Sequence, residues 1–324
     1  MNYRQLGRTG LKVSELSLGF WVTYGNQVGL DVAKSCVSAA LEHGVNYFDN
    51  ADIYGKSEAE KVMGAIIKDL DRSKLVLSSK VYFPMSDDPN DRGLSRKHIM
   101  ESVHKTLKRL GTDYLDMYFC HRYDYESPLD ETVRAMSDLV QQGKVLYWGV
   151  SEWRAGQITN AYRIAEKWGL YPPQVEQPQY NMFHRHRVEN ELAPNVDDLG
   201  YGLVVWSPLA SGILTGKYND GIPSGSRMSM ESMNWLQKYL TQEKVEKVRK
   251  LSAVADELGC SMAQLAIAWL LRMPQVSSVI TGASRPEQVH ENMKALDVLP
   301  KLTPDVLDHI EEILQNDPNA GGFI

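Results

Sequence analysis

The chain has 324 residues, a formal net charge of −6 and a sequence pI near 5.8, an acidic balance that disfavours nucleic acid and anionic membrane surfaces as general partners. Its three cysteines, Cys36, Cys120 and Cys260, are widely spaced and form no C-x-x-C motif, which favours a reducing compartment and indicates neither a disulfide framework nor a zinc ribbon. No basic and apolar leader precedes the first predicted strand, and the most apolar helical run ends at Arg272, so we expect a cytoplasmic protein with no membrane insertion.

Strand-like and helix-like stretches alternate along the chain after a predicted N-terminal hairpin, in which residues 3–6 and 12–13 flank a turn at residues 7–10. Such alternation implies a parallel sheet, and eight units imply closure into an α/β fold of the (β/α)8 TIM barrel type, with residues 1–324 forming one domain. The predicted strands are residues 16–18, 46–48, 75–79, 114–119, 145–150, 174–176, 203–206 and 277–281. The predicted helices are residues 31–43, 57–69, 95–110, 128–142, 154–168, 187–199, 243–258 and 286–296.

Two additions to this repeat are predicted. Residues 208–242 are rich in Gly, Ser and Met without clear periodicity, and because so long a connection in a compact domain is usually functional, we interpret it as a lid. A second helical stretch at 262–272 precedes the last strand, and Thr303-Pro304 begins a further C-terminal helix at 305–315. We expect the tail at residues 316–324 to be loose.

A doubly wound dinucleotide-binding fold is the structural alternative. That fold requires a G-x-G-x-x-G motif where the chain leaves the first strand. The sequence has G-x-G at Gly200-Tyr201-Gly202, which runs into a predicted strand instead of out of one. The barrel is therefore favoured.

The stretch from Asn46 to Gly55 has a catalytic layout, because a short strand ends at a carboxylate and a phenol follows five residues later. The strand leaves its core at Asp49. Ser57-Glu58-Ala59-Glu60 has the spacing of a capping box, so a helix should begin at Ser57. Asp49 to Tyr54 then form a strand-to-helix loop, which in an α/β barrel belongs to the active face.

Acid and base groups follow three consecutive predicted strands. These strands end at Asp49, Lys80 and His121, and Tyr54 lies just beyond the first of them. A cationic Lys80 beside Tyr54 favours the phenolate and should pull the phenol pKa down from about 10 toward neutrality. Asp49 would keep Lys80 charged, and His121 can hydrogen-bond the oxygen of a bound carbonyl.

Each of these residues alone has a simpler explanation. An Asp–Lys pair in the mouth of a barrel, such as Asp49 and Lys80, is more often a structural ion pair than a catalytic one. His121 alone is better explained as a hydrogen-bonded histidine at a strand end. The four residue types together favour catalysis. A barrel metallohydrolase would need a histidine pair after the first strand, where Phe20-Trp21 stands. We predict no metal, because His184-Arg185-His186 lies just before a helix, lacks a third ligand and is interpreted as a solvated loop.

The chain resembles the aldo-keto reductase superfamily, and most closely the branch that contains the voltage-gated potassium-channel beta subunits and their plant and bacterial relatives. The resemblance implies an NADPH-dependent reductase of aldehydes and ketones with a catalytic tetrad of Asp49, Tyr54, Lys80 and His121, in which Tyr54 is the general acid. The motifs that carry it are Leu18-Gly19-Phe20-Trp21-Val22-Thr23-Tyr24-Gly25, Phe48 to Gly55, Trp206-Ser207-Pro208-Leu209-Ala210-Ser211-Gly212, Leu214-Thr215-Gly216-Lys217-Tyr218, and Gly282-Ala283-Ser284 through Glu291-Asn292.

The same resemblance implies the cofactor contacts, and it makes residues 208–242 a cofactor-covering loop. Trp206 would stack on the nicotinamide or simply be core, and Glu291 and Asn292 could equally be an exposed helix face. The implied nicotinamide contacts are Trp21, Gln27, Asp49, Ser151, Gln177 and Trp206; those to the pyrophosphate are Ser207, Leu209, Ser211, Gly212 and Lys217; those to the adenosine end are Arg227, Gly282, Ser284, Arg285, Gln288, Glu291 and Asn292.

Two positions depart from the family pattern. Some channel beta subunits have Asn where His121 stands, so the tetrad is closer to that of an ordinary reductase. Many reductases have Asn after the carboxamide serine, whereas Glu152 follows Ser151 here. The alternative function is a regulatory subunit that binds NADPH tightly, turns over slowly and reports redox state to a partner such as a membrane channel. The branch also suggests a homo-oligomer, with a tetramer as one form.

Overall fold

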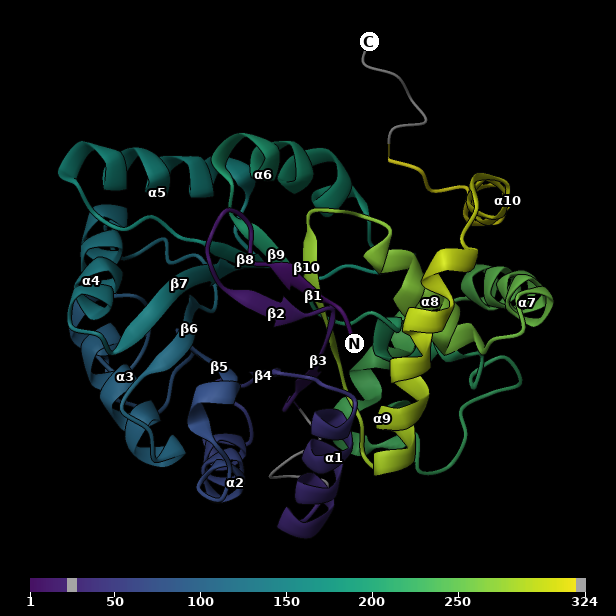
Figure 1. Ribbon diagram of the computed structural model, residues 1–324, viewed down its shortest axis with the longest axis horizontal. Helices are drawn as coiled ribbons and strands as arrows, with labels where there is room; N and C mark the ends of the chain where they lie inside the picture. The colour runs from purple at the N-terminus through teal and green to yellow at the C-terminus, as the bar shows by residue number, and fades with distance from the viewer. Residues whose placement is uncertain (22–27, 319–324) are drawn as a thin grey trace.

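The computed structural model describes residues 1–21 and 28–318. Within these residues, a closed barrel of parallel strands in the order β10-β3-β4-β5-β6-β7-β8-β9 lies at the centre, with the helices around it (Figure 1). Strands of this kind are short apolar runs because both of their faces are buried. The predicted (β/α)8 TIM barrel is confirmed. The barrel strands are β3 (Leu16–Gly19), β4 (Tyr47–Asp49), β5 (Val76–Val81), β6 (Leu115–Cys120), β7 (Val145–Ser151), β8 (Val175–Gln177), β9 (Gly202–Val205) and β10 (Val276–Thr281).

The helices cover the outside of the barrel. α8 (Met262–Leu271) is buried almost all round, which explains why its sequence has no polar face. No helix in the described ranges is long and apolar enough to cross a bilayer by itself, and α7 with α8 meet such a criterion only as a pair bent by 86°. The other helices are α1 (Leu30–Glu42), α2 (Glu58–Ile67), α3 (Arg96–Leu110), α4 (Leu129–Gln141), α5 (Ala155–Trp168), α6 (Ala193–Leu199), α7 (Gln242–Glu257), α9 (Pro286–Met293) and α10 (Pro304–Leu314).

The N-terminal hairpin closes one end of the barrel. β1 (Tyr3–Gln5) and β2 (Lys12–Ser14) pair antiparallel, as predicted. The Arg8 N–H donates to Gly200 O just before β9 begins, and Ser277 Oγ donates to Gln5 O at the start of β10. Because these contacts lie where strands begin, the carboxyl ends of the strands are left for the site.

The predicted capping box before α2 is wrong. Ser57 has a left-handed backbone with φ 74°, and its hydroxyl donates to Asp52 O instead of capping the helix. The Glu60 side chain is fully buried, accepts a hydrogen bond from Ser79 Oγ and pairs with Arg109 at 2.5 Å. A buried ion pair between α2 and α3 therefore replaces the local interaction that the sequence pattern indicated.

The irregular segments carry more structure than the sequence indicates. Residues 208–242 include 3₁₀ turns at Ala210–Thr215, Arg227–Ser229 and Glu231–Tyr239, and a π-helical turn at Arg187–Leu192 precedes α6. Asn316 Nδ2 donates to Met182 O, and Asn190 Nδ2 donates to Pro318 O. Residues 316–318 thus contact the body of the protein without regular secondary structure, and residues 319–324 of the expected loose tail lie outside the described residues.

Candidate active site

Asp49 is the last residue of β4, and the carboxylate lies inside the barrel at its carboxyl end with 3% of the residue exposed. Oδ1 accepts hydrogen bonds from Ser78 Oγ at 2.8 Å, Gln177 Nε2 at 2.9 Å and Tyr47 OH at 3.2 Å. Oδ2 accepts one from Lys80 Nζ at 2.8 Å. Each oxygen of the buried carboxylate is thereby satisfied and fixed in orientation.

Lys80 connects the carboxylate to the phenol. Its side chain is fully buried, and Nζ donates to Asp49 Oδ2, to Asn50 O at 2.6 Å and to Tyr54 OH at 3.1 Å. An ammonium has three donors, and here each has an acceptor. Burial lowers the pKa of Lys80, whereas the Asp49 carboxylate opposes that change and stabilises the charged form.

Tyr54 lies on the loop between β4 and α2, and its side chain is partly exposed. Burial of the phenol and then the Asp49 carboxylate raise the pKa of Tyr54 well above its usual value of 10, although Arg122 opposes the rise. The pKa of Tyr54 is therefore raised and not lowered as expected, because burial and the Asp49 carboxylate outweigh the Arg122 guanidinium. The phenol keeps its proton across the neutral range.

His121 directly follows β6 and lies beside the phenol. Its ring centroid is 5.9 Å from that of Tyr54 and 5.0 Å from that of Phe83, edge to face in both cases. Burial, Lys80 and Arg122 lower the pKa of His121 well below 6.5, so the ring is neutral near pH 7. His121 Nδ1 is buried without a hydrogen-bond partner in the described part of the chain. The four predicted tetrad residues are thus brought together.

Ser151 and Gln177 lie side by side at the ends of β7 and β8. Ser151 Oγ donates to Gln177 O at 2.8 Å, while the Gln177 amide donates to Asp49. Trp206 follows β9, with its ring centroid 6.3 Å from that of Trp21. These residues line the same end of the barrel as the tetrad, whereas Gln27 lies outside the described residues.

Glu152 connects three strand ends, a role that the sequence analysis missed. Its backbone is left-handed with φ 61°, and Oε1 accepts from the Gln179 N–H at 2.6 Å and from Trp206 Nε1 at 3.0 Å. Oε2 pairs with Arg187 Nη1 at 2.5 Å. A non-glycine residue in this conformation stores strain that the surrounding contacts must hold. The sequence signal was the departure at Glu152, but its partner is 35 residues further along the chain.

The loop after β9 has an unusual backbone. Ser207, Ala210 and Ser211 have φ of 60°, 47° and 58°, and Gly212 follows with 95°. A Cβ built on Gly212 would lie 3.0 Å from Lys217 Nζ, so the lysine ammonium crosses directly over the glycine. Strained, concave backbone of this kind is common where anions bind.

The predicted adenosine-end residues lie on the loop after β10 or on α9, apart from Arg227. Ser284 N–H and Oγ both donate to Gln288 Oε1, and Asn292 is buried with its amide near Gly282 O. Glu291 instead faces Gln264 and Lys294. Arg285 is largely exposed, 3.8 Å from Glu287. The Arg227 guanidinium lies 5.7 Å from the Trp21 ring centroid.

The His184-Arg185-His186 stretch is only partly a solvated loop. Both histidines are exposed, but Arg185 is buried and pairs with Glu189 at 2.9 Å and Glu311 at 2.5 Å. The interpretation of this stretch as solvated is therefore wrong for Arg185, which fastens α10 to the loop before α6. No group of three or more His, Cys, Asp or Glu side chains in the searched part of the chain has metal-binding geometry.

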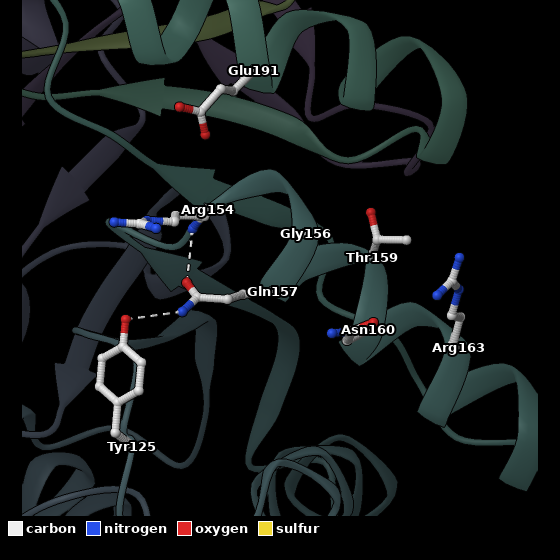
Figure 2. Close-up of a pocket in the computed structure, with 8 residues that line it drawn as sticks. All are labelled: Tyr125, Arg154, Gly156, Gln157, Thr159, Asn160, Arg163 and Glu191. Carbon is white, nitrogen blue, oxygen red and sulfur yellow. Dashed lines mark hydrogen bonds between the residues drawn. The ribbon is translucent and has the colours of Figure 1, made fainter.

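One cavity lies away from the tetrad. It has a volume of about 630 Å³ and lies beside α5. Figure 2 shows that Gln157 accepts a hydrogen bond from the Arg154 N–H and donates one to Tyr125 OH. It contains none of the predicted site residues. Its lining residues are Tyr125, Arg154, Gly156, Gln157, Thr159, Asn160, Arg163 and Glu191.

A closed (β/α)8 barrel with Asp, Lys, Tyr and His gathered at the carboxyl ends of its strands is the arrangement that the resemblance to aldo-keto reductases implies. Residues 15–315 match the Aldo/keto reductase family, and the chain belongs to that family, whose members typically bind NADP(H). The chain is similar to three proteins along nearly its whole length. It is 52% identical to a probable voltage-gated potassium channel subunit beta of Arabidopsis thaliana, over 98% of both chains. It is 51% identical to a protein of the same description from Oryza sativa subsp. japonica, again over 98% of both. A putative voltage-gated potassium channel subunit beta of Schizosaccharomyces pombe is 49% identical, over 98% of this chain and 94% of that protein.

Proposed function

We propose that the protein reduces aldehydes and ketones to alcohols with NADPH. The observation that carries this proposal is the position of the Lys80 ammonium, which contacts both the Asp49 carboxylate and the Tyr54 hydroxyl beside a neutral His121. An ion pair that only stabilised the barrel would have no need of a partly exposed phenol as its third partner. The arrangement therefore favours proton transfer to a bound oxygen.

The residues around the tetrad fit NADPH. Arg227 pairs with no acidic side chain in the described ranges, so its charge is available to a phosphate. Burial lowers the pKa of Arg227, which means that a bound anion would stabilise its charged form. The strained turn at Ser211 and Gly212, crossed by Lys217, suits the pyrophosphate. Trp206, fixed through its Nε1 by Glu152, offers an aromatic face for the nicotinamide.

In the proposed mechanism, NADPH supplies the hydride that the carbonyl carbon receives. The Tyr54 hydroxyl donates its proton to the carbonyl oxygen, and Lys80 stabilises the phenolate that remains. Asp49 keeps Lys80 charged and in place. His121, being neutral, carries one N–H with which it can hold the carbonyl oxygen against Tyr54. A proton from solvent then restores the phenol.

The direct test is to measure NADPH oxidation by the purified protein against a panel of aldehydes, ketones and dicarbonyls. We expect clear steady-state turnover with at least one reactive aldehyde and formation of the alcohol in equal amount. Absence of turnover across the panel, in a protein that binds NADPH, would refute the reductase.

The second candidate is a slow, NADPH-binding regulatory subunit of a membrane channel, which the names of the three relatives support. Such a protein would form a homo-oligomer, with a tetramer as the proposed form, and would bind a channel partner in the cytoplasm. Stoichiometric NADPH retained through purification, together with failure on the carbonyl panel, would favour this candidate over the enzyme.

A further inference from the structure

Arg122 lies next to the tetrad but has no role in the mechanism above. It follows His121 on the loop after β6, and its side chain is partly exposed. Nη1 donates to His121 O at 2.5 Å, and the guanidinium carbon lies 5.6 Å from the Phe83 ring centroid. The remaining donors of this guanidinium have no acceptor among the described residues.

The surroundings do not neutralise this charge. Arg122 forms no ion pair with any acidic side chain in residues 1–21 and 28–318. The carboxylate of Asp124, two residues away, accepts hydrogen bonds from the Leu94 N–H at 2.7 Å and from Ser127 Oγ at 2.6 Å instead. Arg122 also acts electrostatically on both Tyr54 and Lys80, so its charge is felt where the carbonyl is proposed to bind. A partly buried guanidinium without a counter-charge is costly unless a ligand supplies one.

The rings form a row between the phenol and the guanidinium. Tyr54 contacts His121, His121 contacts Phe83, and Phe83 lies beneath Arg122. A substrate with its carbonyl at Tyr54 and an apolar spacer along Phe83 would carry its other end to Arg122. The planar fork of arginine matches a carboxylate in particular.

We propose that Arg122 selects carbonyl substrates that also carry a carboxylate. The inference rests on the proposed reductase function and adds a substrate class to it. Arg122 is a specificity residue that holds the far end of the substrate, whereas Tyr54 and His121 bind the carbonyl oxygen.

The test compares two aldehydes that differ only in charge, 4-carboxybenzaldehyde and its neutral methyl ester. The quantity measured is the ratio of their kcat/KM values, with NADPH saturating. In Arg122→Gln we expect the acid-to-ester ratio to fall by about 10- to 100-fold, as for loss of one charge-assisted hydrogen bond. Arg122→Lys should restore part of the ratio.

Arg163→Gln is the matched control, because it removes the same charge from an exposed position on α5 beside the separate cavity (Figure 2). It should leave the ratio unchanged. Benzoate provides a second readout: it should inhibit competitively with the aldehyde, and more weakly in Arg122→Gln than in the wild type. An equal ratio in wild type and Arg122→Gln, with the ester reduced normally, would overturn the role of Arg122 and leave the reductase standing. If the wild-type protein reduces neither aldehyde, both the reductase function and the role of Arg122 would be overturned.

Discussion

The proposed chemistry depends on how the buried Asp49–Lys80 ion pair holds the hydroxyl of Tyr54. Asp49 receives four donors, so its negative charge is spread over a fixed network, and Lys80 is held between it and Tyr54. The raised pKa of Tyr54 means that the phenol waits in its acid form. The proposed proton donor therefore carries its proton throughout the neutral pH range.

Tyr54→Phe should remove most carbonyl reduction and leave NADPH binding near normal, because the hydroxyl acts only in the chemical step. Loss of a general acid costs about 100- to 10,000-fold in kcat. Steady-state kinetics with the best aldehyde of the panel, together with fluorescence titration of NADPH, separate the two effects. Near-wild-type reduction by the variant would show that another group supplies the proton.

Arg227→Ala should weaken NADPH by about 10- to 100-fold, because one charge-assisted hydrogen bond to the 2'-phosphate is lost. Arg285→Ala should act in the same direction by a smaller factor, since Arg285 is largely exposed and lies near Glu287. NADH lacks this phosphate and is the matched control ligand. Equal weakening of both cofactors in fluorescence quenching titrations would mean that these arginines do not read the 2'-phosphate.

At the scale of elements, α2 and α3 pack so closely that a glycine is needed between them. A Cβ on Gly64 in α2 would lie 2.3 Å from Arg109 O, a backbone atom that cannot move aside easily. The same contact region holds the buried Glu60–Arg109 pair, so the position of α2 relative to α3 is fixed twice. Because the Tyr54 loop leads directly into α2, this packing also positions the phenol.

Gly64→Ala should destabilise the protein by about 1 to 3 kcal/mol, the usual cost of overpacking, despite the better helix propensity of alanine. Gly156→Ala is the matched control, because a Cβ at this site in α5 meets nothing within 4 Å. The control should be neutral or stabilising by up to about 1 kcal/mol. Urea unfolding of both variants measures the difference, and equal midpoints would show that α2 and α3 can separate at little cost.

At the scale of the whole molecule, strand and helix order was predictable because most barrel strands are short segments with buried apolar residues between polar turns. Helix starts were less predictable. Ser57 and Glu60 have the spacing of a capping box, but Glu60 forms an ion pair with Arg109, which is distant in sequence. Local patterns cannot show such a competitor.

The candidate active site was predictable in part. Strand ends of a parallel barrel lie together, so Asp49, Lys80 and His121 could be grouped from sequence. Period-two alternation could also have indicated Tyr47 and Ser78, which share a barrel face with Asp49 and Lys80. The Glu152–Arg187 pair could not be predicted, because it depends on how two loops fold.

Global stability should fall as pH rises from about 4 to 7 through one buried carboxyl group. Burial, and then Glu60, raise the pKa of Asp52 from 3.8 to about 7. In this window the folded state holds a proton that the unfolded state has lost, so stability decreases with pH. At about 1.4 kcal/mol per pKa unit, the loss is at most about 4 kcal/mol by pH 8.

Asp52→Asn should remove this loss, so the variant should gain on the wild type between pH 5 and pH 8 in urea unfolding. The exposed Asp87→Asn removes the same formal charge and should follow the wild type. Parallel pH profiles for wild type and Asp52→Asn would mean that Asp52 ionises normally in the folded protein.

The hairpin covers the amino ends of the barrel strands, whereas the candidate active site lies at their carboxyl ends. Substitutions in the hairpin act on closure and stability, since residues such as Gly7 lie against Gly200 at the start of a strand. Substitutions at the opposite end act on Tyr54, Arg122 and their neighbours. A substitution at the open end can therefore change which molecules the site accepts without removing the contacts that close the other end.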